Sequence, residues 1–152
     1  MRRWWWPRRR LYRYPIVLLL LFGAIQLIPY GRNHTDPRVV AEPKWNSPAT
    51  RTLAVTACFD CHSNQTKWWW ATDIAPFSWL VSRDVQKGRE ILNFSEWGTS
   101  LQGRRSSDPQ RIADSVLRGR MPPLQYWIVH WNAKLSSAQK QQLANGFLAS
   151  LK

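Results

Sequence analysis

The feature that constrains this chain most is the run Cys58-Phe59-Asp60-Cys61-His62. Two thiols at this spacing can each add across a vinyl group of haem, and the adjoining imidazole then lies under the iron. The pattern C-x-x-C-H is therefore typical of a c-type haem attachment site. It predicts one covalently attached haem and an export-side location, where thioether attachment is expected to occur.

Three other interpretations of the motif explain less. A thioredoxin-like redox site would follow a strand in a βαβ pattern, and no strand alternation precedes Cys58. A structural zinc site needs four nitrogen or sulfur ligands, but beyond the motif the chain offers only His34 and His130 and no further cysteine. A bare disulfide would leave His62 without a role.

The positive charge is concentrated at the N-terminus. The net charge is +13, and residues 1–14 contain six arginines and no acid. A basic chain suggests nucleic-acid binding, but the next segment explains this block better. From Tyr14 to Gly31 the chain carries no charge and is rich in leucine, and arginines before such an apolar span hold that end in the cytoplasm. We therefore predict a basic cytoplasmic tail at 1–14 and a transmembrane signal anchor at 15–30.

The alternative to a retained anchor is a cleaved signal peptide. Its apolar region usually has about 7 to 15 residues and ends in an A-x-A-like site, and no such site follows Leu27. Both interpretations place Cys58 outside the cytoplasm. The expected location is the bacterial cytoplasmic membrane, crossed once, with the C-terminal domain in the periplasm.

The rest of the chain predicts a linker and a helical domain. Residues 31–46 are polar and contain prolines, as a linker does. Residues 47–152 show repeated helix-start signals and no convincing strand period. A cap followed by proline occurs at Ser47-Pro48 and Asp108-Pro109, and a capping box joins Ser136 to Gln139. We predict an all-α, cytochrome c-like domain of about four helices around one haem.

Three details belong to this prediction. Pro76 opens a helix with Phe77, Leu80, Val81, Val85 and Leu92 at helical spacing, and Gly88 is a possible interruption. The stripes of the later helices are Ile112, Val116 and Leu117, and then Leu143, Phe147, Leu148 and Leu151. The loop that contains Arg104 and Arg105 is either solvated or available to a haem propionate or a docking partner.

The sixth iron ligand has two main candidates, Met121 and His130. Met121 follows a helix end and precedes two prolines, whose restricted backbone can hold a thioether against iron with little loss of entropy. Packing in the core is the alternative role for this methionine. His130 lies between Val129 and Trp131 and could take the axial position or hydrogen-bond a backbone group. We predict Met121, with His130 as the alternative.

A longer pattern resembles the haem-binding domain family of membrane-anchored bacterial c-type cytochromes. The matching residues are Glu42-Pro43, the run Ala57 to Asn64, Ile74-Ala75-Pro76, Ser78 to Val81, Gly88-Arg89, the run Leu92 to Trp97, Met121-Pro122-Pro123, Tyr126, His130, Ala133 and Leu135-Ser136. The resemblance implies that Cys58 and Cys61 carry the thioethers and that His62 is the proximal ligand. Similar proteins commonly have Trp-Pro-Trp where this chain has Trp68-Trp69-Trp70, so the local turn is expected to differ.

These observations predict electron transfer at the periplasmic face, with iron ligated by His62 and Met121. The basic surface favours acidic redox partners, and the N-terminal segment favours membrane lipid. We predict no nucleic-acid partner, no small-molecule substrate and no enzymatic activity, since no Ser/His/Asp set or acid pair for hydrolysis is evident. The alternative function is a haem-based redox or gas sensor in which the sixth ligand is displaced.

Overall fold

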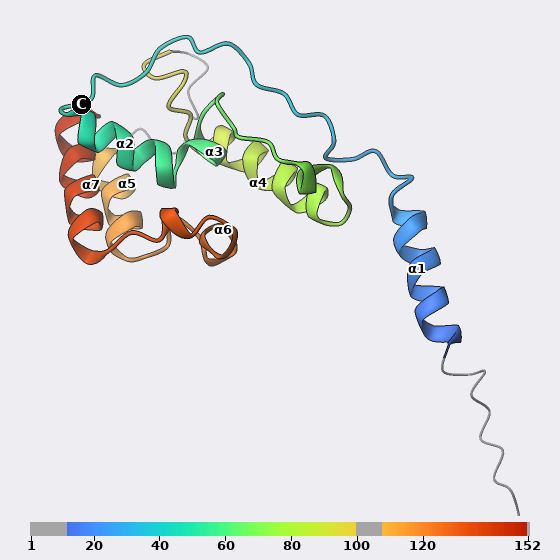
Figure 1. The fold of residues 1–152 in the computed structure, drawn as a ribbon. Helices are drawn as coiled ribbons and strands as arrows, with labels where there is room; N and C mark the ends of the chain where they lie inside the picture. Colours follow the sequence, from blue (N-terminus) through green and yellow to red (C-terminus); the bar gives the residue numbers. More distant parts are fainter. Residues whose placement is uncertain (1–11, 100–107, 152) are drawn as a thin grey trace, which may run out of the picture. The chain divides into compact units, whose positions relative to one another are not determined.

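A computed structural model describes residues 12–99 and 108–151 (Figure 1). These residues are mainly helical and contain no strand; their one β feature is an isolated parallel bridge between Ala41 and Glu96. The predicted all-α class is confirmed. The described residues form two compact units, one made of the chain up to His34 with Trp69–Ser82, the other of Thr35–Trp68 with the chain from Arg83 onward.

The first unit contains the apolar helix α1, Arg13–Ile25. Its apolar side chains from Ile16 to Phe22 are exposed. The helix ends at Gln26, whose side chain donates to the Ala75 carbonyl and accepts from the Ala75 amide, both at 2.9 Å. α1 has 13 residues, where a span needs about 17 to 25. Within the predicted span 15–30 the helix continues only as far as Ile25. None of the helices in the described ranges is long and apolar enough to cross a membrane.

The remaining helices of the described residues are more numerous than the predicted four, and several of them are short. They are α2 (Pro48–Ala57), α3 (Phe59–His62), α4 (Phe77–Ile91), α5 (Pro109–Leu117), α6 (Leu124–Val129) and α7 (Ser137–Ser150), with 3-10 turns at Trp70–Asp73 and Trp131–Ala133. The predicted starts are confirmed. Ser47 accepts from the Thr50 amide, Asp108 accepts from the Gln110 amide, and Ser136 and Gln139 form the capping box.

The core of the second unit is aromatic and lies where α2, α5 and α7 pack together (Figure 1). Phe94 is fully buried and stacks on Phe59 and Phe147, with ring centroids 5.6 and 5.8 Å away. Trp45 contacts all three rings at 5.5 to 6.3 Å. These stacked rings tie the segment after α4 to α3 and α7, and they fix the wall on which a cofactor could rest.

The segment predicted as a linker packs more closely than expected. Trp45 joins the aromatic core, and Val40 and Ala41 donate backbone hydrogen bonds to the Ser95 carbonyl at 2.8 and 3.1 Å. Asn46 donates to the Ser150 hydroxyl at 2.9 Å. The second half of residues 31–46 is therefore part of the domain, because a partly buried indole and the hydrogen bonds of three backbone amides hold it in place.

Some predicted details differ in the structure. Gly88 continues α4 instead of interrupting it. Leu80, Leu117 and Leu148, which belong to the apolar positions of the predicted helices, are exposed. Leu117 and Leu148 each follow a buried residue, Val116 and Phe147, and one position turns a side chain by about 100°. Arg104 and Arg105 lie outside the described residues.

Candidate cofactor site

The motif forms a single helical turn directly after α2. The Cys58 carbonyl accepts from the amides of Cys61 and His62, at 3.2 and 2.9 Å. Phe59 anchors the turn in the aromatic core. Residues three and four positions apart share one face of a helix, and Cys58 and His62, four positions apart, line the same cavity.

The His62 imidazole is oriented by the backbone of α4. Its Nδ1 atom lies 3.0 Å from the Gly88 carbonyl oxygen and 3.1 Å from the Leu92 carbonyl oxygen. An imidazole nitrogen that meets carbonyls carries the proton, which leaves the lone pair on Nε2. Burial also lowers the pKa of His62, although the two backbone hydrogen bonds oppose this shift. The ring is therefore held neutral, with Nε2 available as a metal ligand.

Gly88 and Arg89 of α4 hold the motif from outside. A Cβ atom at Gly88 would overlap the Cys61 carbonyl oxygen, so the absence of a side chain lets the helix approach the motif closely. The Arg89 guanidinium donates to the Ser63 and Thr35 carbonyls at 2.8 and 2.7 Å, and it forms an ion pair with Asp36 at 2.8 Å. These contacts fix the chain on both sides of His62.

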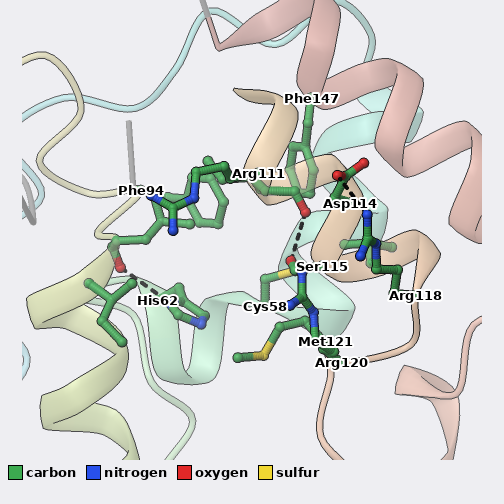
Figure 2. A pocket seen from close by; sticks show the side chains of 14 residues that line it. Cys58, His62, Phe94, Arg111, Asp114, Ser115, Arg118, Arg120, Met121 and Phe147 are labelled. Carbon is green, nitrogen blue, oxygen red and sulfur yellow. Dashed lines mark hydrogen bonds and ion pairs between the residues drawn. The ribbon is translucent and has the colours of Figure 1, made fainter. Parts of the chain in front are cut away.

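A cavity of about 530 Å³ opens beside the motif (Figure 2). Its volume lies in the range of about 300 to 1,000 Å³ that ligand sites occupy. Cys58, His62 and Met121 line it together, although His62 and Met121 come from α3 and the loop after α5. Met121 is 36% exposed, and its amide donates to the Ser115 carbonyl at 3.1 Å. The structure thus brings three of the predicted site residues to one cavity.

The cavity wall has an apolar part and a charged part. Leu92, Phe94, Ile112, Val116 and Phe147 supply apolar surface, and Arg111, Arg118 and Arg120 supply positive charge. A large apolar ring system with acidic substituents would contact apolar side chains with its ring and arginines with its acidic groups. The residues present fit haem, because the cavity combines this lining with a neutral histidine nitrogen and a thioether.

The two cysteines differ in position but share a raised pKa. Both are free thiols, and Cys58 lines the cavity while Cys61 is absent from its lining. Burial raises the pKa of Cys58 to about 12, assisted by Cys61. Burial, with the charges of Asp60 and Asp84, likewise raises the pKa of Cys61 to about 12. Redox-active C-x-x-C sites need a lowered thiol pKa, so these surroundings disfavour the thioredoxin-like alternative.

His130, the alternative sixth ligand, lies outside the cavity lining. Its ring stacks on Tyr126 with centroids 4.3 Å apart, and its Nε2 is 3.9 Å from an Asp60 carboxylate oxygen. The Tyr126 hydroxyl donates to the same oxygen at 2.6 Å. This cluster attaches α6 to the motif, and it keeps the His130 ring with Tyr126 rather than with Met121.

Sequence reasoning identified the motif and Met121 but missed their supports. The sequence predicts Gly88 as a possible helix break, but the helix continues through it. The spacing of Arg89 and Asp60 does not indicate their roles. The sequence does contain a pattern that indicates the position of two arginines on α5. Arg111 and Arg118 are seven positions apart, on the polar side of a helix whose Ile112 and Val116 are buried.

Comparison with known proteins gives one match. A domain family described as the haem-binding domain matches residues 20–149, which is most of the chain. Neither a curated protein nor a solved structure matches. The cavity beside the motif fits the cofactor for which this family is described. The chain therefore belongs to the haem-binding domain family and is a haem-binding protein.

Proposed function

We propose that the chain is a monohaem c-type cytochrome that transfers electrons. Cys58 and Cys61 would carry the thioether bonds, and His62 and Met121 would be the axial ligands. The observation that supports this most is the orientation of His62, whose Nδ1 is bonded to two carbonyls while its Nε2 stays available beside Met121. Bound haem supplies a one-electron iron couple, and His/Met ligation raises its reduction potential.

The chain's own residues supply rigidity and exclusion of water. Two backbone carbonyls fix the tautomer and the plane of the His62 ring. Pro122 and Pro123 restrict the backbone after Met121. The buried rings of Phe94 and Phe147 cover one wall. A ligand set held this firmly changes little when the iron changes charge, as electron transfer requires.

We also propose that the protein acts at the periplasmic face of the bacterial cytoplasmic membrane. The exposed apolar side chains of α1 and the arginines that precede it in the sequence support membrane attachment. The positive net charge supports acidic redox proteins as partners. Replacing Leu19 with aspartate is expected to release the protein from carbonate-washed membranes, whereas Thr52→Asp, at an exposed position of α2, is expected to leave it bound. Equal retention of both variants would contradict the attachment.

Covalent attachment is tested on the denatured protein. Wild type from cells competent in cytochrome c maturation is expected to keep its haem through acid-acetone extraction and to give the pyridine haemochrome spectrum of two thioethers. Each of Cys58→Ser and Cys61→Ser is expected to shift that spectrum toward one thioether, and the double variant to lose the haem. A colourless extracted wild type would contradict the proposal.

The sixth ligand is tested by a matched pair of variants. Met121→Ala is expected to abolish a sulfur-to-iron charge-transfer band and to let the reduced iron bind carbon monoxide, because the thioether is lost. His130→Ala is expected to keep the band, since His130 lies outside the cavity lining. Loss of low-spin character in the His130 variant alone would assign the ligand to His130.

One observation favours a second function, a haem-based redox or gas sensor. Met121 is 36% exposed and sits on a loop rather than in a helix, so the ligand could be displaced without opening the core. Rapid binding of carbon monoxide by reduced wild type would support the sensor. Failure of the reduced wild type to bind carbon monoxide would support electron transfer.

A further inference from the structure

The cavity has a charged wall built mainly by α5. Arg111, Asp114, Ser115 and Arg118 line it, at positions i, i+3, i+4 and i+7, which is one face of a helix (Figure 2). Arg120, three residues after the end of the helix, adds a further guanidinium. Ile112 and Val116, the neighbouring positions, are buried and supply the apolar part of the same lining. α5 therefore contributes both an apolar strip and an adjoining basic strip to the cavity wall.

The charges on this wall do not cancel. Arg118 lies 3.5 Å from Asp114 and is balanced by it. Arg111 and Arg120 form no ion pair with any carboxylate in the described ranges. With three arginines and one aspartate, the cavity lining carries an excess of two positive charges. This excess matches a ligand that combines a large apolar body with two carboxylates.

We propose that Arg111 and Arg120 bind the two propionate carboxylates of haem and so set the orientation of the macrocycle in the cavity. This inference rests on the proposed haem attachment, and it assigns residues that the motif does not include. Haem carries both propionates on one edge, and the apolar remainder of the ring would then face Phe94, Phe147 and Leu92, which also line the cavity.

The chemistry of the guanidinium group suits this role. Arginine presents a planar fork of donors that matches a carboxylate, and it stays charged in any protein environment. A cation next to a propionate favours the ionised carboxylate and lowers its pKa. Both arginines are exposed, so their replacement by glutamine removes charge without leaving a buried gap.

The experiment compares intact haem-loaded wild type with Arg111→Gln, Arg120→Gln and the double variant. The control is Arg83→Gln, since Arg83 is exposed on α4 and absent from the cavity lining. The midpoint reduction potential is measured as a function of pH. Infrared redox-difference spectra are recorded with haem labelled with carbon-13 at the propionate carboxyls. The double variant with lysine at both positions tests whether charge alone suffices.

We expect the glutamine variants to move the pH inflection of the potential upward, because each propionate loses the cation that favours its ionised form. The potential at neutral pH is expected to fall, and the labelled carboxylate band to shift. The lysine variant is expected to restore the inflection at least in part, and Arg83→Gln to behave as wild type. Each single glutamine variant is expected to show smaller shifts of the inflection, the potential and the carboxylate band.

A labelled band and an inflection unchanged in the double variant, with normal haem content, would overturn the inference. Such a result together with slower electron exchange with acidic proteins would assign the arginines to partner docking instead. These outcomes leave the proposed haem attachment intact. A wild type that holds no haem after denaturation would instead contradict that attachment.

Discussion

Gly88→Ala is expected to prevent stable assembly of the haem site. A Cβ atom at this position would overlap the Cys61 carbonyl oxygen and lie 2.9 Å from its carbonyl carbon. These are backbone atoms of the motif, so they cannot move aside as a flexible side chain can. Helix α4 would have to shift away from the motif, and this would break the hydrogen bond from His62 Nδ1 to the Gly88 carbonyl.

The expected loss exceeds the roughly 1 to 3 kcal/mol that ordinary overpacking costs. It is measured as haem content per chain, and as the free energy of unfolding of the material that folds. Gly23→Ala is the matched control, because Gly23 is also helical and a Cβ there would meet nothing within 4 Å. Full haem content with an unchanged axial-ligand spectrum in Gly88→Ala would show that α4 does not hold the motif in this way.

The parts of the fold that follow local rules were predictable. A capping side chain acts within about three residues, and the starts at Ser47, Asp108 and Ser136 were each placed correctly from the sequence. The motif is likewise local, since its five residues form one helical turn. Met121 was identified as a ligand candidate because a methionine between a helix end and two prolines is unusual in itself.

The supports of the site were not predictable, because they join residues far apart in the chain. The His62 ring meets carbonyls of residues 88 and 92, and no pattern in either segment indicates this. Trp45 lies in a polar, proline-bearing stretch that looks like a linker, yet it packs on Phe94. The length of α1 was overestimated, since apolar composition alone does not show that Gln26 ends the helix.

Phe94→Ala is expected to cost about 3 to 5 kcal/mol of unfolding free energy, the range for deletion of a buried phenylalanine. Phe94 is fully buried and stacks on three rings, Phe59, Trp97 and Phe147. Stacked pairs add about 0.5 to 1.5 kcal/mol to the area buried. The measurement is denaturant unfolding of the haem-loaded and haem-free proteins, followed by circular dichroism.

Phe94 also connects the core to the cofactor site. Comparing the unfolding of the haem-loaded and haem-free proteins tests this connection. Its amide donates to the His62 carbonyl at 2.8 Å, and its ring lines the cavity (Figure 2). Truncation therefore removes surface on which haem would rest, so the haem-loaded protein should lose at least as much stability as the haem-free one. Trp131→Ala removes an indole that is 85% exposed and should cost under about 0.5 kcal/mol. A Phe94→Ala cost similar to that of Trp131→Ala would mean that the stacked rings do not form the core, and that the cavity wall is held by other contacts.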